Sequence, residues 1–243
     1  MRRTRQAFDE QLEGLERRLV EMGSFVAGML DRAVRSLKDH DVALAREVIA
    51  ADDVADDMDL DIERECMRLL ALQQPMSRDL RTIGTVLKVI ADVERVGDYS
   101  VDIAKTAVTL AETEYFKPLE DIPRMADLAR KMMRLSLEAL VQRDLELVRQ
   151  VVDLDDEVDR LWYKLHDQLE HTMQQQPELV PQAIALLLVA RYLERTADHT
   201  VNIAERVAYR ETGKLEALAT SHGPDFRPED EAPGEPPAAA DEQ

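Results

Sequence analysis

The stretch "ERVGDYSVDIA" at residues 94–104 is repeated one hundred residues later as "ERTADHTVNIA" at residues 194–204, with six of the eleven positions identical. A weaker repeat precedes each copy. The stretch "DDVADDM" at residues 52–58 matches "DDEVDRL" at residues 155–161. Because both pairs occur in the same order, the sequence predicts a tandem duplication of one structural unit, with halves at about residues 8–111 and 122–210.

The two halves are expected to be helical. Neither Gly nor Pro occurs in residues 29–74 or 124–176, whereas the good helix formers Ala, Leu, Glu and Arg are abundant. The pattern predicts an all-α fold of six helices, at about residues 5–39, 42–72, 78–113, 124–141, 145–173 and 181–211.

Three helices in each half make two tandem three-helix bundles, at residues 1–113 and 124–213, joined by a linker at 114–123. Residues 221–243 contain five of the ten prolines and seven acidic side chains against one arginine. This composition predicts a disordered acidic tail.

The overall charge restricts the possible partners. With 31 basic and 50 acidic side chains the formal net charge is -19, so nucleic-acid phosphates and anionic lipid repel the chain as a whole. The longest wholly apolar run, residues 183–190, is far shorter than the roughly 20 residues of a membrane span. A single cysteine and the absence of a recognisable leader predict a cytoplasmic protein that reaches a membrane only through partners.

Four of the predicted helices carry acidic side chains four residues apart beside an apolar stripe. On the third helix the stripe centres on Ile90; Glu94 falls about 40° from that centre and Asp98 about 80°. The same placement recurs on the second, fifth and sixth helices. The pairs are Asp52 with Asp56, Glu94 with Asp98, Asp155 with Asp159, and Glu194 with Asp198.

Carboxylates four residues apart on a helix repel one another, and burying them without a partner is costly. One solution is a metal: acidic pairs from two adjacent helices offer oxygen ligands suited to iron(III), manganese, magnesium or calcium. Another is pairing with arginine, and a third is a solvated acidic face. The fourfold recurrence favours a cation site. The arginines near enough in sequence are Arg78, Arg81, Arg95, Arg191 and Arg195.

The paired "ERxGDxxxxIA" and "ERxADxxxNIA" motifs, together with "RLLALQQPMSRDLR" at residues 68–81, resemble the PhoU family of phosphate-transport regulators. The resemblance implies two similar three-helix bundles, a homodimer, and metal clusters, with iron the first expectation, held by the E/D-x-x-x-D motifs. The implied ligands are Asp52, Asp56, Glu94 and Asp98 in the first bundle and Asp155, Asp159, Glu194 and Asp198 in the second. Asn202 replaces Asp102 and Ala197 replaces Gly97, so the second site is expected to hold fewer or different ions.

The resemblance further implies a cytoplasmic negative regulator of phosphate uptake and of phosphate-starvation genes. In that role the protein is an adaptor between the ATPase subunit of the phosphate importer and a phosphate-sensing histidine kinase. The alternative is a helical metal-binding or structural scaffold with no role in phosphate signalling.

Catalysis is not expected. The chain has no Glu-x-x-His pair for a di-iron oxidase, no phosphate-binding glycine loop and no nucleophile elbow. Cys66 lies on an apolar stripe and is predicted to be a core thiol, and His199 is predicted to be a surface residue.

Overall fold

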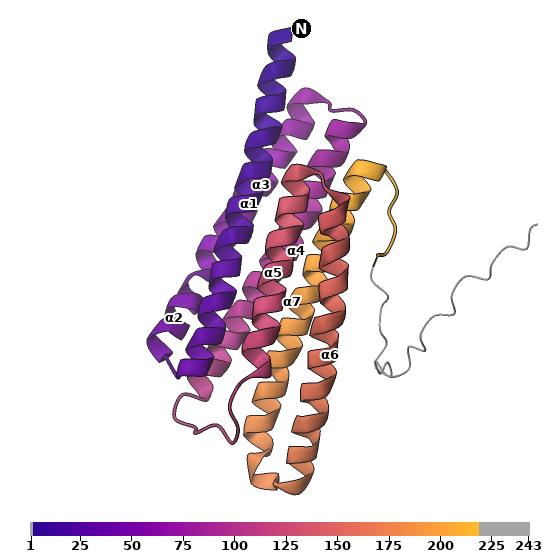
Figure 1. The fold of residues 1–243 in the computed structure, drawn as a ribbon. Helices are drawn as coiled ribbons and strands as arrows, with labels where there is room; N and C mark the ends of the chain where they lie inside the picture. The colour runs from indigo at the N-terminus through magenta and orange to yellow at the C-terminus, as the bar shows by residue number, and fades with distance from the viewer. Residues whose placement is uncertain (1, 219–243) are drawn as a thin grey trace, which may run out of the picture.

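The computed structural model describes residues 2–218, and within that range it contains helices and no strand (Figure 1). The all-α prediction is confirmed. The predicted tail at 221–243 lies outside the described residues. The elements are α1 (Arg2–Asp39), α2 (Val42–Ala50), α3 (Asp52–Gln73), α4 (Arg78–Thr109), α5 (Asp121–Gln142), α6 (Leu145–Gln175), the 3₁₀ turn η1 (Pro177–Leu179) and α7 (Val180–Thr212).

The second predicted helix is interrupted at Ala51, which separates α2 from α3. The Asp41 carboxylate caps the start of α2 by accepting a 2.9 Å hydrogen bond from the Leu44 backbone N–H. Asp52 and Asp53 occupy the first turn of α3, where negative charge interacts favourably with the helix dipole. These acidic residues allow a new helix to begin immediately after the break.

Two helices begin slightly earlier than predicted, because proline is tolerated in the first turn of a helix. Pro123 is the third residue of α5, which starts at Asp121 rather than at 124. Pro181 is the second residue of α7. In both first turns the missing proline N–H has no intrahelical partner to lose.

The helices form two bundles side by side, as the duplication predicts. In the first bundle α1, α2 and α3 pack around α4; in the second, α5, α6 and α7 pack on one another. The bundles meet where α4 contacts α7 and where α1 contacts α5. The α3–α4 and α6–α7 connections lie at opposite ends of the elongated molecule, so the two repeats run antiparallel (Figure 1).

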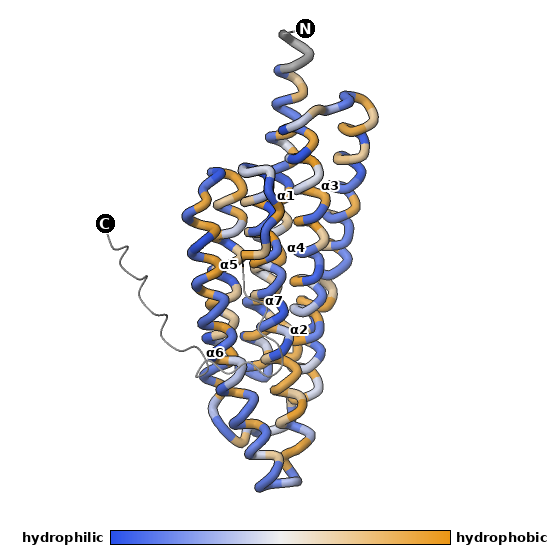
Figure 2. Tube along the Cα trace, turned by 90° about the vertical axis from the view of Figure 1, so that its right-hand side faces the viewer, coloured by the Kyte–Doolittle hydropathy of each residue, from blue (hydrophilic) through white to orange (hydrophobic). Residues whose placement is uncertain are grey.

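Hydrophobic residues recur turn by turn along the helices and supply a continuous core (Figure 2). Residues 86–101 and 186–201 share the same burial at every position, which places the two copies of the acidic motif in equivalent structural positions. Cys66 is fully buried, and burial raises the pKa of its thiol to about 12, as expected for a core cysteine. No helix within residues 2–218 has the length and apolar character required to cross a membrane.

Candidate metal centres in the two repeats

The first acidic cluster comprises Asp52 and Asp56 of α3 with Glu94 and Asp98 of α4, two helices that pack together. Burial, followed by repulsion from Asp56 and Asp98, raises the pKa of Asp52. Burial and the neighbouring charge of Asp98 likewise raise the pKa of Glu94, with a smaller contribution from Asp56. The structure therefore brings the four predicted residues of this repeat within electrostatic reach of one another.

The second acidic cluster comprises Asp155 and Asp159 of α6 with Glu194 and Asp198 of α7. Asp155 is only 8% exposed, and burial together with repulsion from Asp159 and Asp198 raises its pKa to about 8. Burial raises the pKa of Glu194 to about 7 and also raises that of Asp198. Without a compensating cation, this cluster retains protons at neutral pH.

Two oxygens in the second cluster have no hydrogen-bond partner. Oδ1 of Asp155 and Oε2 of Glu194 are both buried. A buried carboxylate oxygen without a donor is unfavourable, whereas a bound cation would satisfy it directly. The donor set, carboxylate oxygens alone, is the one that hard cations prefer. The donor chemistry of the second cluster therefore suits such a cation.

Arginine side chains neutralise part of both clusters. In the first, Arg95 lies 2.7 Å from Asp98 and 3.6 Å from Glu94, nitrogen to oxygen. In the second cluster, each carboxylate pairs with its own arginine. A nitrogen of Arg191 lies 2.5 Å from an oxygen of Glu194, and a nitrogen of Arg195 lies 3.0 Å from an oxygen of Asp198.

Arg78 and Arg81 do not join either cluster, although the sequence places them near enough. Arg78 lies 3.8 Å from Glu211, and Arg81 donates to the backbone carbonyl of Arg210. Both side chains contact the end of α7, because the antiparallel packing brings the start of α4 beside it.

The closest grouping of potential ligands lies elsewhere. Within residues 2–218, the one set of three His, Cys, Asp or Glu residues whose ligand atoms lie within 4.8 Å of one another is His166, Asp167 and Glu170 on α6. This set was not predicted, although the His-x-x-x-Glu spacing of His166 and Glu170 is visible in the sequence. The predicted carboxylates are more widely spaced, and arginines hold four of them.

Asp59 is an additional member of the first cluster that was not predicted from the sequence. Burial raises its pKa, with further contributions from Glu63 and Asp56, and its charge acts on Glu94. The signal was the continued spacing of acidic residues along one face of α3. At the 103-residue offset between the repeats, its counterpart is Trp162.

His199 is not the surface residue that was predicted. It is half-buried between α7 and α4, with Nδ1 2.9 Å from Oδ1 of Asp92 and Nε2 3.5 Å from the Tyr99 hydroxyl. Tyr99 also stacks on Tyr192, with ring centroids 5.8 Å apart. Residue 92 therefore contacts residue 199, and the equivalent residue 192 contacts residue 99. This exchange of equivalent positions is what a pseudo-two-fold axis between antiparallel α4 and α7 produces.

A family model described as "PhoU domain" matches the chain twice, over residues 19–107 and 122–207. A "Phosphate-specific transport system accessory protein PhoU homolog" from Clostridium acetobutylicum is 36% identical over 212 residues, covering 87% of this chain and 97% of that protein. A homologue of the same description from Aquifex aeolicus is 36% identical over 206 residues, covering 85% and 93%.

Solved structures of PhoU proteins are also similar to this chain. The crystal structure of PhoU from Pseudomonas aeruginosa superposes with a TM-score of 0.82 at 33% identity, covering 85% of this chain and all of that one. The phosphate transport system regulatory protein PhoU from Streptococcus pneumoniae superposes with a TM-score of 0.82 at 31% identity, covering 87% and 100%.

Proposed function

Because this chain belongs to the PhoU family, we propose that it is an accessory protein that regulates phosphate transport and binds hard metal cations in its two acidic clusters. The regulatory role is supported by the family match, which covers both repeats, and by relatives described as phosphate-transport accessory proteins. The metal-binding role is supported by the two unpartnered buried oxygens of Asp155 and Glu194.

The ligands proposed for the first repeat are Asp52, Asp56, Glu94 and Asp98, and those for the second are Asp155, Asp159, Glu194 and Asp198. A bound cation supplies positive charge that links α3 to α4, or α6 to α7. Iron is the first candidate by family resemblance, and manganese, magnesium and calcium suit the same oxygen ligands. The competing hypothesis is that Arg95, Arg191 and Arg195 neutralise the clusters without metal.

The proposed cellular role is that of a cytoplasmic negative regulator. A homodimer of this chain contacts the ATPase subunit of the phosphate importer and a phosphate-sensing histidine kinase, and it keeps phosphate-starvation genes off when phosphate is abundant. A helical metal-binding scaffold without phosphate signalling is the alternative that must be tested against it.

The metal proposal is tested by elemental analysis of protein purified without a histidine tag or chelator. The test variant combines Glu94→Gln, Asp98→Asn, Glu194→Gln and Asp198→Asn, and the matched control combines Asp57→Asn with Asp153→Asn at exposed positions. We expect near-stoichiometric metal in the wild type and the control and none in the folded test variant. Metal absent from all three, even after reconstitution, would support arginine pairing instead.

The regulatory proposal is tested by deleting the gene and following a phosphate-starvation reporter in high phosphate. We expect derepression that the wild-type gene reverses, and co-purification of the wild-type protein with the importer ATPase. An unchanged reporter together with no co-purification under phosphate-replete, metal-replete conditions would leave the scaffold alternative.

A further inference from the structure

The C-terminal half of α6 carries a set of potential metal ligands that differs from both acidic clusters, because it includes an imidazole. His166, Asp167 and Glu170 each offer one ligand atom, and these three atoms lie within 4.8 Å of one another. His166 and Glu170 are four residues apart, so their side chains lie on the same face of the helix. A single helix therefore presents one nitrogen and two carboxylate ligands together.

The distance between two of these ligands matches that in a tetrahedral metal site. Nδ1 of His166 lies 3.4 Å from Oδ1 of Asp167, whereas an N–H···O hydrogen bond is usually about 2.9 Å long. Two ligands that each lie about 2.0–2.1 Å from a tetrahedral Zn²⁺ ion are about 3.3–3.4 Å apart. The ring of His166 packs on Trp162, with centroids 4.8 Å apart, and this contact restricts the orientation of the imidazole. Glu170 is exposed, so its carboxylate can join the other two ligands by side-chain rotation.

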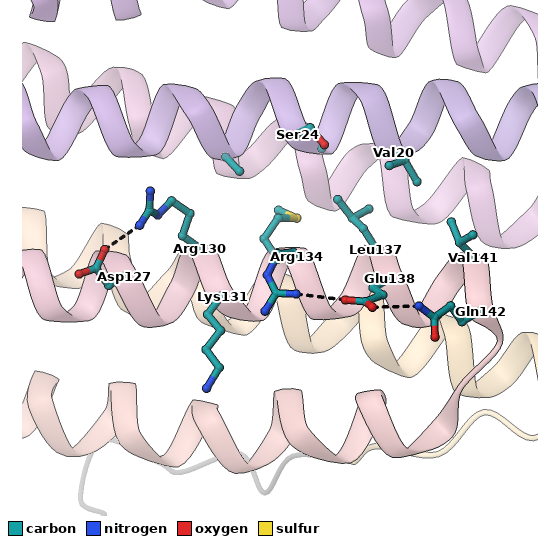
Figure 3. A pocket seen from close by; sticks show the side chains of 13 residues that line it. Val20, Ser24, Asp127, Arg130, Lys131, Arg134, Leu137, Glu138, Val141 and Gln142 are labelled. Carbon is teal, nitrogen blue, oxygen red and sulfur yellow. Dashed lines mark hydrogen bonds and ion pairs between the residues drawn. The ribbon is translucent and has the colours of Figure 1, made fainter.

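Arginines neutralise carboxylates elsewhere in this chain. In the groove of about 680 Å³ between α1 and α5, for example, two arginines of α5 pair with acidic residues of the same helix (Figure 3). The α6 set differs, because no lysine or arginine occurs in residues 165–190. Within residues 2–218, no lysine or arginine pairs with Asp167 or Glu170, and Glu170 accepts a 3.2 Å hydrogen bond from the Gln174 amide. The negative charge of this set is therefore available to a metal cation.

The set is specific to the second repeat. At the 103-residue offset, the equivalent positions in the first repeat hold Glu63, Arg64 and Met67. The first repeat thus has neither the imidazole nor the second carboxylate, and it places a positive charge where the second repeat has Asp167. Any metal bound by these α6 residues has no counterpart on α3.

We propose that His166, Asp167 and Glu170 form a metal site distinct from both acidic clusters, which binds Zn²⁺ with water in the remaining position. Imidazole suits zinc, copper and nickel, whereas oxygen ligands alone suit magnesium, calcium and manganese. Mn²⁺ binds a site with a nitrogen ligand more weakly than Zn²⁺ does. Zinc binding on α6 depends neither on metal in the acidic clusters nor on a phosphate-related partner.

The first test measures the Zn²⁺ affinity of the full-length protein by competition with a chromogenic chelator. We expect a dissociation constant below about 10 μM for the wild type, and binding at least about ten-fold weaker in His166→Gln and in Asp167→Asn. His171→Gln is the matched histidine control, because His171 is exposed on α6 but lies outside the ligand set. Asp153→Asn, also exposed on α6, is the matched carboxylate control. The eight carboxylates of the acidic clusters are unchanged in all of these proteins, so differences in affinity report on the α6 set.

The second test uses Trp162, the only tryptophan in the chain, whose ring packs on His166. Ni²⁺ prefers the same ligands as Zn²⁺ and quenches the fluorescence of a nearby indole, so we expect low micromolar Ni²⁺ to quench Trp162 in the wild type. His166→Gln should reduce this quenching at least about five-fold. Asp159→Asn, in the second acidic cluster, should leave most of it in place.

Unchanged Zn²⁺ affinity and unchanged Ni²⁺ quenching in His166→Gln would overturn the assignment of this site. Equal losses of affinity in His166→Gln and His171→Gln would also overturn it, because they would indicate unspecific binding by surface histidines. A wild-type dissociation constant above about 0.1 mM would have the same meaning. None of these outcomes would alter the regulatory proposal, and an unchanged phosphate-starvation reporter would not alter zinc binding on α6.

Discussion

Asp155 is 8% exposed, whereas Asp52, which occupies the same position in the first repeat, is only half-buried. The contrast extends to the glutamates, since the side chain of Glu94 is 30% exposed and that of Glu194 is 12% exposed. Each residue of the α4 motif nevertheless falls in the same burial class, buried, half-buried or exposed, as its counterpart in the α7 motif. The difference must therefore come from the helices packed against them.

Two features of those helices account for the difference. In the first repeat, Asp52 directly follows the break at Ala51, where the chain bends between α2 and α3. In the second, α6 runs without interruption through Asp155. At the 103-residue offset Trp162 corresponds to Asp59, so α6 carries an aromatic side chain at the position where α3 carries an acidic one. The carboxylates are present in both repeats, but those of the second repeat are less exposed to solvent.

The largest expected effect of this difference is on stability as a function of pH. In metal-free protein, the folded state retains protons on Asp155 and Glu194 that the unfolded state loses, because their pKa values are about 8 and about 7. Stability should therefore fall as pH rises from about 4 to about 8. One pKa unit corresponds to about 1.4 kcal/mol, so the shift of Asp155 alone, from 3.8 to about 8, corresponds to on the order of 6 kcal/mol.

Urea unfolding in EDTA at pH 5, 6, 7 and 8 measures this loss. Asp155→Asn combined with Glu194→Gln should flatten the pH dependence, whereas the matched pair Asp52→Asn with Glu94→Gln should flatten it much less. Equal flattening by the two double variants would show that the two clusters are equally solvated, contrary to the greater burial of Asp155.

The next effect concerns the linkage between metal binding and protons. Protonated carboxylates must release their protons before they can ligate a cation. Because both retained protons must be released, affinity at the second cluster should rise on the order of 50-fold between pH 6 and 7, with a weaker dependence at the first. Trp162 is the only tryptophan in the chain and lies one helical turn beyond Asp159, so its fluorescence reports on the second cluster.

The measurement is a Mn²⁺ titration of Trp162 fluorescence at several pH values. Asp159→Asn should abolish the fluorescence response, whereas Asp56→Asn, its counterpart in the first repeat, should leave it nearly unchanged. A response that is independent of pH would contradict the assignment of retained protons to the second cluster.

A smaller difference is expected between the two arginines that pair with the motif glutamates. Arg191→Gln leaves the largely buried carboxylate of Glu194 without its partner and should destabilise the metal-free protein by about 1–3 kcal/mol at pH 8. Arg95→Gln removes an arginine that is 57% exposed and should cost less than about 0.5 kcal/mol. Chemical unfolding of the two variants at pH 8 provides the comparison, and similar losses would argue against a drier second cluster.

The sequence predicted the parts of the fold that depend on local periodicity. Apolar residues at helical spacing located the helices, and the angles of Glu94 and Glu194 beside their stripes agree with their half-buried positions in the structure. The duplicated order of the motifs predicted two bundles, because equivalent segments with the same apolar pattern pack in the same way.

The remaining features depend on contacts between elements, which periodicity cannot reveal. His199 was assigned to the surface because its counterpart in the first repeat is Tyr99 rather than a second histidine, but antiparallel packing places Asp92 and Tyr99 of α4 against it. The unequal burial of Asp52 and Asp155 has the same origin. Their local sequences are alike, whereas the bend at Ala51 and the bulk of Trp162 are differences in the surroundings.

The smallest expected effect tests whether the motif helices are interchangeable. Gly97 in α4 corresponds to Ala197 in α7, and a Cβ added at Gly97 would lie 3.8 Å from Val26 and 4.0 Å from Ala55, which are ordinary contact distances. Gly97→Ala should therefore stabilise the protein by up to about 1 kcal/mol through helix propensity, and Ala197→Gly should destabilise it by a similar amount. Thermal unfolding of both variants measures these changes. If Gly97→Ala instead destabilises the protein, α1 and α3 pack more tightly around α4 than these distances indicate, and the two motif helices are not equivalent even in their backbone surroundings.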